Sequence, residues 1–334
     1  MTARMKAIVR TQYGSPDVLR LAEIDRPTVS DHNVLVRVRS AAVNSGDWRL
    51  MRGRPFLIRL MFGGIWKPKI QVLGFDMAGE VEAIGRHVTQ VQPGDAVFGD
   101  LSGFGFGAFA EYVSVPETAL VKKPEQLSFE AVAASSGAGL TALQGLRDRG
   151  QLQPGQRVLI NGASSGVGSF AVQIAKLMGA EVTAVCHSRK LDRVRLLGAD
   201  RVIDYTQTDL TQLAKSELHR YDVMFDAAAF QSIAKVLPLV KPGGTYVLVG
   251  GAIAKFLQVL VFGPILFRNC PQNVTALEVK PNQADLMILR DWLASGEMVP
   301  AIDRRYPLHE VPNAIRDLEA RRICGKAVIQ VAQS

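Results

Sequence analysis

Cysteine and histidine are both scarce in this sequence of 334 residues. The three cysteines, Cys186, Cys270 and Cys324, lie far apart and form no CxxC pair. They supply neither a disulfide framework nor a thiolate cluster for a metal. The five histidines show no HxxH or HExxH spacing. Without these ligand patterns a tetrahedral zinc site is not predicted, and we expect no metal centre.

A secretory signal and a clear membrane span are also missing. Residues 1–6 run into charge without an apolar segment, so we expect a cytoplasmic protein. The longest apolar stretch, 242–267, reaches the length of a span. However, it opens with Gly243-Gly244, continues into a β-branched run and contains Pro264. We therefore predict a buried strand followed by an apolar loop or helix.

Acidic residues are absent from 49–69, in a chain whose formal net charge is +8. Six cations are interleaved there with apolar side chains, and such a segment can meet a membrane surface, an anionic ligand or nucleic acid. A surface helix whose arginine stems cover the core is the simpler explanation. We favour that helix, expect no DNA partner and do not favour membrane contact.

The composition is that of a globular protein, with 48% apolar and 21% charged residues. The length suggests two domains. In the first 125 residues, stretches such as 33–40 and 79–85 alternate apolar and polar side chains, which predicts half-buried strands of a β-barrel-like domain. The tail beyond residue 299 ends in a similar strand at 326–331, which we expect to rejoin this first domain.

The pattern changes at Ser128, which we predict to be the N-cap of a helix. Beyond it, strand-like and helical segments alternate, which predicts an α/β fold with a doubly wound parallel sheet and helices on both faces. The predicted strands are 157–161, 181–186, 201–204, 221–226, 245–250 and 274–279. We expect 126–299 to form this domain, and 1–125 with 300–334 to form the other.

The strongest local signal is the segment 158–168, in which a strand leads through small residues into a helix. Such a turn lets backbone N–H groups approach a pyrophosphate at the positive end of the helix. In the GxGxxG register the three positions hold Ala163, Ser165 and Gly168, so two glycines are replaced. The predicted six-strand sheet favours a dinucleotide site over an ordinary strand–helix turn.

The end of the second predicted strand indicates which nucleotide binds. A carboxylate there would bind a ribose 2′-hydroxyl and repel a 2′-phosphate. The segment 185–190 has no acid; it offers the hydroxyl of Ser188 and the cations Arg189 and Lys190. Two cations favour NADP(H). The alternative is the start of a helix with solvated basic side chains.

Taken together, these features resemble the zinc-independent, quinone oxidoreductase-like branch of the medium-chain dehydrogenase/reductases. The resemblance spans nearly the whole chain and rests on the order of its motifs: 41–47 (AAVNSGD), 73–79 (LGFDMAG), 91–95 (VQPGD), 139–142 (GLTA), 161–168 and 198–205 (GADRVIDY). It implies a GroES-like β-barrel catalytic domain, a Rossmann NADP-binding domain and a homodimer. Zinc-dependent relatives place Cys at Asn44 and His-Glu at Phe75-Asp76, so the resemblance also implies that zinc is absent.

The same resemblance implies hydride transfer from NADPH to quinones, α,β-unsaturated carbonyls or related carbonyl compounds, with Asn44 and Asp47 near the nicotinamide. Asn44 either donates a hydrogen bond to the substrate oxygen or shapes a turn, and Asp47 orders the loop. Some relatives carry Tyr two residues after Asp47, where this chain has Arg49. Arg49 would stabilise an oxyanion or hold an acidic substrate, and solvent would supply the proton.

The cofactor contacts that the resemblance implies are Ser45, Thr141, Ser164, Ser165, Gly166, Val167, Ser188, Arg189, Lys190, Tyr205, Val249, Gly250, Gly251 and Lys326. Tyr205 has an alternative as a strand-end residue, and Gly250-Gly251 as a simple turn. Two other functions stay open. One is an enoyl-thioester reductase whose 49–69 cations bind the phosphates of a thioester carrier. The other is a weakly catalytic nucleotide-binding protein that uses its basic face on RNA or a membrane.

Overall fold

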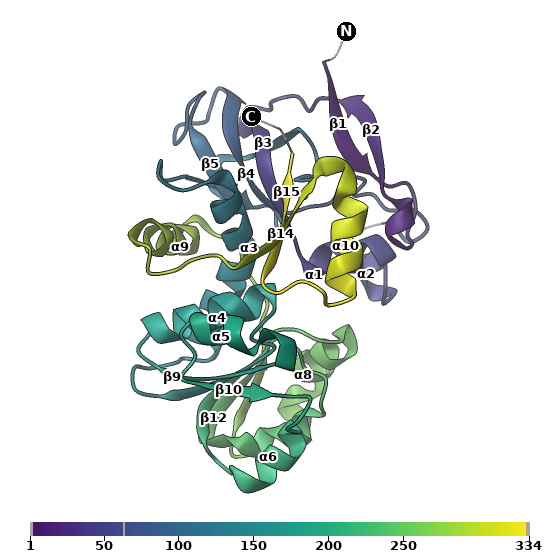
Figure 1. Cartoon of the computed structure of the whole chain (residues 1–334). Helices are drawn as coiled ribbons and strands as arrows, with labels where there is room; N and C mark the ends of the chain where they lie inside the picture. Colours follow the sequence, from purple (N-terminus) through teal and green to yellow (C-terminus); the bar gives the residue numbers. More distant parts are fainter. Residues whose placement is uncertain (1–2, 63, 332–334) are drawn as a thin grey trace. The chain divides into compact units, whose positions relative to one another are not determined.

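The structure is a computed structural model that describes residues 3–62 and 64–331 (Figure 1). It divides into two compact units, Met1–Ala138 with Lys280–Ser334 and Gly139–Val279. The first unit therefore also includes 126–138 and 280–299, which the sequence analysis assigned to the second. Hydrogen bonds explain the difference for the C-terminal part, because the amide of Gln283 donates to the backbone oxygens of Glu117 and Leu120.

The first unit is built on a mixed, mainly antiparallel sheet with the strand order β14-β15-β3-β4-β5-β7, in which β6 also pairs with β3. The strands of the unit are β1 (Arg4–Val9), β2 (Arg20–Asp25), β3 (Asn33–Val43), β4 (Asp76–Ile84), β5 (Ala96–Asp100), β6 (Tyr112–Pro116), β7 (Leu120–Lys122), β14 (Ile302–Pro307) and β15 (Lys326–Gln330). Its helices are α1 (Ser45–Arg52), α2 (Leu57–Met61), α9 (Gln283–Ser295), α10 (Val311–Glu319) and the first part of α3 (Phe129–Gln144).

Strand β3 is longer than predicted because its second half is buried. The alternation over 33–40 continues into Ala41–Val43, whose side chains are all buried. The tail strand β15 pairs antiparallel with this buried half, with Ala327 opposite Val43. The predicted return of the tail to the first domain is therefore confirmed. This pairing also brings the start of β15 beside the end of β3, where α1 begins.

In the second unit, six described strands form a parallel sheet in the order β10-β9-β8-β11-β12-β13. They are β8 (Arg157–Asn161), β9 (Glu181–Cys186), β10 (Arg201–Asp204), β11 (Tyr221–Asp226), β12 (Val240–Leu248) and β13 (Asn273–Ala276). Numbered within the unit, this order is 3-2-1-4-5-6, the Rossmann arrangement. The predicted doubly wound sheet is confirmed, and the first four strands have the predicted bounds. The fifth and the sixth begin and end earlier than predicted.

Helices cover both faces of this sheet (Figure 1). They are α4 (Gly166–Leu177), α5 (Leu191–Leu196), α6 (Leu210–Ser216), α7 (Ile233–Val236) and α8 (Ile253–Leu266). One core cluster joins Leu159 of β8 with apolar residues of α6, α7 and α8. Because strand side chains alternate, Val158 and Ile160 point to the opposite face, where α4 packs on β8 and β9.

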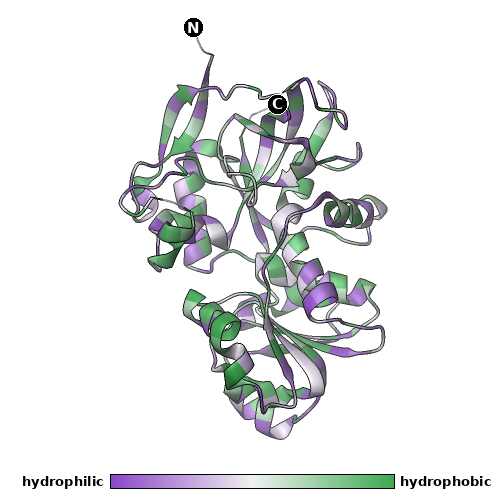
Figure 2. Cartoon of the chain, turned by 180° about the vertical axis from the view of Figure 1, so that it is seen from behind, coloured by the Kyte–Doolittle hydropathy of each residue, from purple (hydrophilic) through white to green (hydrophobic). Residues whose placement is uncertain are grey.

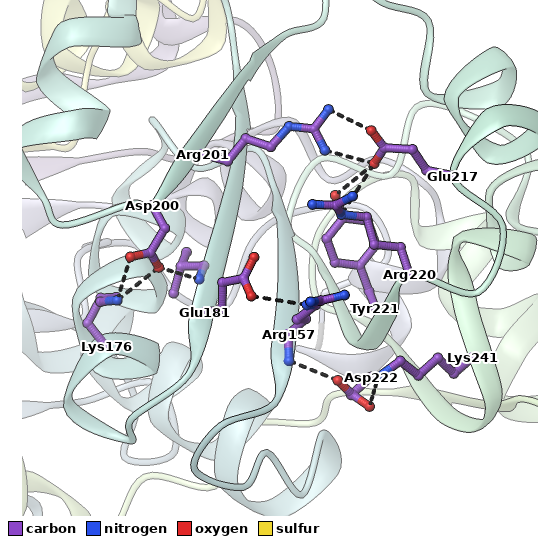
Figure 3. A network of polar contacts seen from close by, with 11 residues as sticks. Arg157, Lys176, Glu181, Asp200, Arg201, Glu217, Arg220, Tyr221, Asp222 and Lys241 are labelled. Atoms are coloured by element: carbon purple, nitrogen blue, oxygen red, sulfur yellow. Dashed lines mark hydrogen bonds and ion pairs between the residues drawn. The ribbon is translucent and has the colours of Figure 1, made fainter.

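Ion pairs link the ends of the strands at the N-terminal edge of this sheet (Figure 3). Lys176 pairs with Asp200 at 2.8 Å, and Arg157 pairs with Glu181 at 3.0 Å. The backbone N–H of Arg157 also donates to Asp222 at 2.8 Å. Further pairs join Arg201 to Glu217 and Lys241 to Asp222. Charged side chains thus form ion pairs with one another along this edge. The Gly-rich turn lies at the opposite, C-terminal edge.

The apolar stretch 242–267 forms the end of β12 and helix α8, as the sequence predicted. In the part of the chain that the structure describes, no helix is long and apolar enough to cross a membrane. Helix α8 is nevertheless unusual, because Val259 and Gly263 are buried while most of its other apolar side chains are exposed. In Figure 2 this helix is coloured mostly as hydrophobic.

Candidate functional site

The turn between β8 and α4 offers backbone donors to an anion. The N–H groups of Gly162 and Ala163 bond to the oxygen of Val185, which fixes the turn against β9. Ser165 is the N-cap of α4, and its Oγ accepts the N–H of Gly168 at 3.0 Å. A helix leaves its first N–H groups without intrahelical acceptors. The first two here belong to Gly166 and Val167, at the positive end of the helix.

The departures from GxGxxG have a local explanation. Ala163 is fully buried, and Ser165 supplies the cap that a glycine would lack. The third position does require glycine, because a Cβ on Gly168 would lie 2.2 Å from the oxygen of Gly162. Helix α4 can approach the strand this closely only without a side chain at that position. The turn therefore keeps the shape of a pyrophosphate cradle with one of the three glycines.

A buried polar network that the sequence analysis missed joins β8 to β11 at the point where the strand order reverses. Asp226 ends β11, and its carboxylate accepts hydrogen bonds from the Asn161 amide at 2.8 Å and the Tyr246 hydroxyl at 2.7 Å. It also accepts the N–H of Ala229 at 2.6 Å. Burial raises the pKa of Asp226. The available signal was that two adjacent buried strands, β8 and β11, both end in a polar residue.

This network positions the loops of the C-terminal edge, where ligands of doubly wound sheets bind. The backbone N–H groups of Val249 and Gly250 both bond to the oxygen of Asp226 at 3.0 Å. A Cβ on Gly250 would lie 1.9 Å from the oxygen of Ala227, so the two loops cross in close contact. Gly251 follows with φ +102°, a conformation that favours glycine. Val249, Gly250 and Gly251 therefore lie at the same edge as the α4 turn.

The predicted 2′-phosphate residues gather at the ends of β9 and β10. The Nδ1 atom of His187 accepts the N–H of Arg189 at 3.2 Å, which shapes a short 3-10 turn over Ser188–Lys190. The His187 ring packs edge-on against Tyr205, with centroids 5.7 Å apart. Tyr205 and Arg189 are exposed at this edge. Ser164 and Ser165 lie in the neighbouring turn, and Thr141 lies in the part of α3 that belongs to this unit.

In the first unit, Asn44 lies between β3 and α1 as the N-cap of the helix. Its Nδ2 group donates to Asp76 at 2.8 Å and to the oxygen of Ala42 at 3.2 Å. An amide nitrogen has two hydrogens, and both are engaged. This geometry does not support the expectation that Asn44 donates to a substrate oxygen. It supports the alternative, in which Asn44 shapes the turn before α1.

Lys326 is buried beside Asn44, with 2% of its surface exposed. Its Nζ donates to Asn44 Oδ1 at 2.5 Å and to Asp76 Oδ2 at 3.0 Å. The other oxygen of Asp76 accepts the N–H of Gly137 at 2.7 Å. The ammonium therefore neutralises a fully buried carboxylate and orients the Asn44 amide. Lys326 was predicted to contact the cofactor, and the described contacts place its ammonium within this cluster.

Two further buried carboxyls lie near Lys326. Asp47 accepts the N–H groups of Asn44 at 2.8 Å and Gly74 at 3.0 Å, and therefore joins α1 to the segment before β4. Burial raises the pKa of Asp47 to about 7. Burial, aided by the charge of Asp76, likewise raises the pKa of Asp100 to about 7. Asp47 thus orders the loop as expected, and the exposed Ser45 and partly buried Arg49 follow it on α1.

The raised pKa of Asp100 predicts a pH dependence of stability. The unfolded carboxyl loses its proton near pH 4. Between that value and about 7, the folded state holds a proton that the unfolded state has lost. The free energy of unfolding therefore falls as pH rises through this window, by up to about 1.4 kcal/mol per pH unit, and levels off above it.

Asp100→Asn should remove the contribution of Asp100 to this slope, because an amide does not titrate, while Asp47, whose pKa is also raised to about 7, keeps its own contribution. The amide oxygen can still accept the N–H of Ser102. Urea unfolding of both proteins across the window measures the two slopes. We expect the variant to gain stability relative to the parent chain as pH rises. Parallel stability curves would contradict the assignment.

The residues around Asn44 do not fit a zinc ion. Within the described ranges, no group of three or more His, Cys, Asp or Glu side chains is arranged to hold a metal. The Phe75 ring lies against Gly46 and Gly137, where a Cβ on either glycine would come within 3.0 Å of it. The Lys326 ammonium places a positive charge beside Asp76, which disfavours a second cation there. No step of the chemistry is therefore assigned to a metal.

Comparisons with known proteins cover both units. The family model described as "Alcohol dehydrogenase GroES-like domain" matches residues 30–125, and the one described as "Zinc-binding dehydrogenase" matches 197–329. The chain is 33% identical to 2-methylene-furan-3-one reductase of Solanum lycopersicum, over 98% of this chain and 79% of that protein. It is also 33% identical to "NADPH-dependent alkenal/one oxidoreductase, chloroplastic" of Arabidopsis thaliana, over 97% and 79%. Among solved structures, the quinone oxidoreductase from Coxiella burnetii matches with a TM-score of 0.87 and 28% identity, covering 99% of this chain and 100% of that one.

Proposed function

Because this chain belongs to the quinone oxidoreductase-like branch of the medium-chain dehydrogenase/reductases, we propose that it reduces quinones and α,β-unsaturated carbonyl compounds with NADPH. The observation that carries the proposal is the C-terminal edge of the second unit. There the turn at Gly168, the 3-10 turn over Ser188–Lys190 and the loop after β12 lie at the edge where doubly wound sheets bind dinucleotides, and this arrangement supports the proposal. The names of the relatives support NADPH and an enone or quinone acceptor.

The residues of this edge fit each part of NADPH. The N–H groups of Gly166 and Val167 would hold the pyrophosphate. Ser188, Arg189, Lys190 and Tyr205 would hold the 2′-phosphate, and no acidic residue lies within 185–190 to repel it. Thr141, Ser164 and Val249–Gly251, which lie in the same unit, belong to the same proposal, whereas the contacts of Ser45 and Lys326 stay predictions of the resemblance. When bound, NADPH supplies the hydride.

Residues of the chain must then stabilise the negative charge that develops on the substrate oxygen. Reduction of an enone or a quinone leaves an enolate or a phenolate, which a nearby cation or hydrogen-bond donor can stabilise without a metal. We assign the oxygen to Arg49 on α1, because a guanidinium carries a positive charge and five N–H donors, whereas the Asn44 amide has only two hydrogens and both are engaged. Burial lowers the pKa of Arg49, yet an arginine stays charged at neutral pH. Asn44 and Asp47 position α1, and solvent supplies the proton.

Arg49 and Asn44 are expected to respond differently to substitution. Arg49→Met should lower turnover at least tenfold, equivalent to ~1.4 kcal/mol of barrier, and should lower the free energy of unfolding less than Asn44→Ala does. Asn44→Ala should also lower turnover at least tenfold, but it should reduce the free energy of unfolding as well, because Asp76 and Lys326 lose a partner. NADPH affinity should be nearly unchanged in both. Steady-state kinetics and urea unfolding separate the two roles, and unchanged turnover in Arg49→Met would contradict the assignment.

The 2′-phosphate assignment predicts a change of cofactor preference. Arg189→Ala combined with Lys190→Ala should raise the KM for NADPH at least tenfold, since hydrogen bonds to a charged group contribute ~1.5–3 kcal/mol each. The KM for NADH should barely change. Arg195→Ala is the matched control, because this exposed cation on α5 is paired with Asp192. Equal effects on both cofactors would defeat the assignment.

The deciding experiment is NADPH oxidation with a panel of ortho- and para-quinones, simple enones and a crotonyl thioester. NADH and a metal chelator are run in parallel. We expect turnover that prefers NADPH, is insensitive to the chelator and is fastest with a quinone or an enone. A preference for the thioester would favour the enoyl-thioester reductase, and tight NADPH binding without turnover would favour the nucleotide-binding protein.

We also propose a homodimer in the cytoplasm, and light scattering would measure the subunit number.

A further inference from the structure

The segment 54–69, here called the basic apolar segment, exposes large apolar side chains instead of burying them. Within it Trp66 is 89% exposed, Met61 68% and Phe56 55%. Its other exposed apolar residues are Leu60, Phe62 and Ile65. The favoured prediction here was a surface helix whose arginine stems cover the core, and it does not account for exposed apolar side chains. In α2 only Ile58 is buried.

The exposed face is held in place from beneath. Ile58 and Pro68 are buried, and the Tyr13 hydroxyl donates to the backbone oxygen of Gly64 at 2.8 Å. The Arg59 guanidinium donates to the oxygen of Gly53 at 3.0 Å and lies over the Tyr13 ring at 4.5 Å. Arg59 is therefore used within the fold. Buried residues and hydrogen bonds therefore fix the backbone of the segment, while its large apolar side chains stay exposed.

Three cations of the segment remain on the surface around the apolar side chains. Arg54, Lys67 and Lys69 are all exposed. Residues 48–75 contain no Asp or Glu, so no acid of the same stretch offsets their charge. By contrast, Arg52, just before the segment, is paired with Glu319. The segment therefore combines exposed apolar side chains with exposed cations whose charge no acid within 48–75 offsets.

We propose that the basic apolar segment docks this protein on an anionic lipid surface. Trp66, Met61 and Phe56 enter the boundary between headgroups and acyl chains, while Arg54, Lys67 and Lys69 face the headgroup phosphates. A protein that lies on a membrane without spanning it attaches stably when apolar side chains and a basic patch act together. This segment carries both. Tryptophan favours the membrane–water interface, and each cation near an anionic surface strengthens binding about fivefold.

Charge and chemistry disfavour the other occupants. A second copy of this chain seated on the same face would bring like charges together. Nucleic acid would engage the cations but leave the aliphatic side chains Met61, Leu60 and Ile65 without a partner. An anionic lipid surface satisfies both halves of the segment. The proposal does not depend on the enzymatic function, because it uses neither the nucleotide turn nor α1.

The test is sedimentation of the full chain with vesicles of phosphatidylcholine mixed with phosphatidylglycerol, and with phosphatidylcholine alone. We expect binding to the mixed vesicles that weakens as salt is added, and little binding to the neutral ones. Trp66→Ser, and separately Lys67→Glu with Lys69→Glu, should each weaken that binding at least tenfold. Leu196→Ser is the matched control, because Leu196 is 87% exposed but lies on α5 in the second unit.

NADPH titration and thermal unfolding without lipid confirm that each variant is folded. The proposal is overturned by absence of binding to the mixed vesicles, by equal binding to both kinds of vesicle, or by loss of binding in Leu196→Ser as large as in Trp66→Ser. A lower mass in solution for Trp66→Ser than for the parent chain would overturn it too, because the segment would then join two copies.

Discussion

Replacing Lys326 with methionine is expected to lower the free energy of unfolding of the NADPH-free protein by about 3–5 kcal/mol, the usual cost of leaving a buried charge without its partner. Asp76 is fully buried, and the Lys326 ammonium lies 3.0 Å from it. Without that ammonium the carboxylate keeps the N–H of Gly137 and the Asn44 amide but loses its counter-charge. Urea unfolding measures the loss.

A second variant shows whether the charge is responsible. Combining Lys326→Met with Asp76→Asn removes both charges, so more than half of the lost stability should return. NADPH titration of the same proteins tests the cofactor contact predicted for Lys326. Unchanged unfolding together with a large loss of NADPH affinity would reject the buried-cluster assignment and favour the cofactor contact instead.

The second large effect is expected at Gly168. A Cβ there would lie 2.2 Å from the oxygen of Gly162 and 2.7 Å from the Cα of Ala163, and both are backbone atoms that cannot simply rotate away. Gly168→Ala should therefore push the start of α4 off the turn. The N–H groups of Gly166 and Val167 would then no longer point together at an anion. We expect NADPH affinity to fall about a hundredfold, equivalent to ~2.7 kcal/mol.

Gly263→Ala provides the matched control within another helix. At Gly263 the nearest atom to an added Cβ is Val259 Cγ1 at 3.7 Å, an ordinary contact. Alanine is also the better helix former, so this variant should keep its NADPH affinity and lose no stability. Calorimetric titration of both variants measures the difference. If Gly168→Ala and the parent chain bind NADPH with equal affinity, the turn is not part of the nucleotide site.

Much of the second unit was predictable from local patterns. A parallel strand buried on both faces appears as a short apolar run, so the bounds of β8 and β9 were predicted without error. Ser128 was correctly predicted to cap α3, and its Oγ accepts the N–H of Ala131. The turn before α4 was found because its residues are neighbours in sequence. In each case the atoms that decide the structure lie within a few residues of one another.

The Asn44 cluster was not predictable in this way. Its members come from the end of β3, the start of β4 and the start of β15, and Lys326 is 282 residues from Asn44 along the chain. From the sequence, 326–331 was predicted to be a strand, and the resemblance assigned Lys326 to the cofactor. Its burial follows from the pairing of β15 with β3, which carries the ammonium to Asp76. Asn161 and Asp226 meet in the same way, across adjacent strands.

The sequence by itself determined the fold class, the Gly-rich turn, the basic residues after β9 and the lack of a zinc ligand set, because each of these is a property of residue types at short spacing. Only the tertiary structure decided which side chains are buried. It removed the free hydrogens of Asn44, placed Lys326 against a buried carboxylate and left Trp66 exposed. Burial and pairing depend on segments that meet across the fold, and these set whether a polar group is available for chemistry or used to hold the protein together.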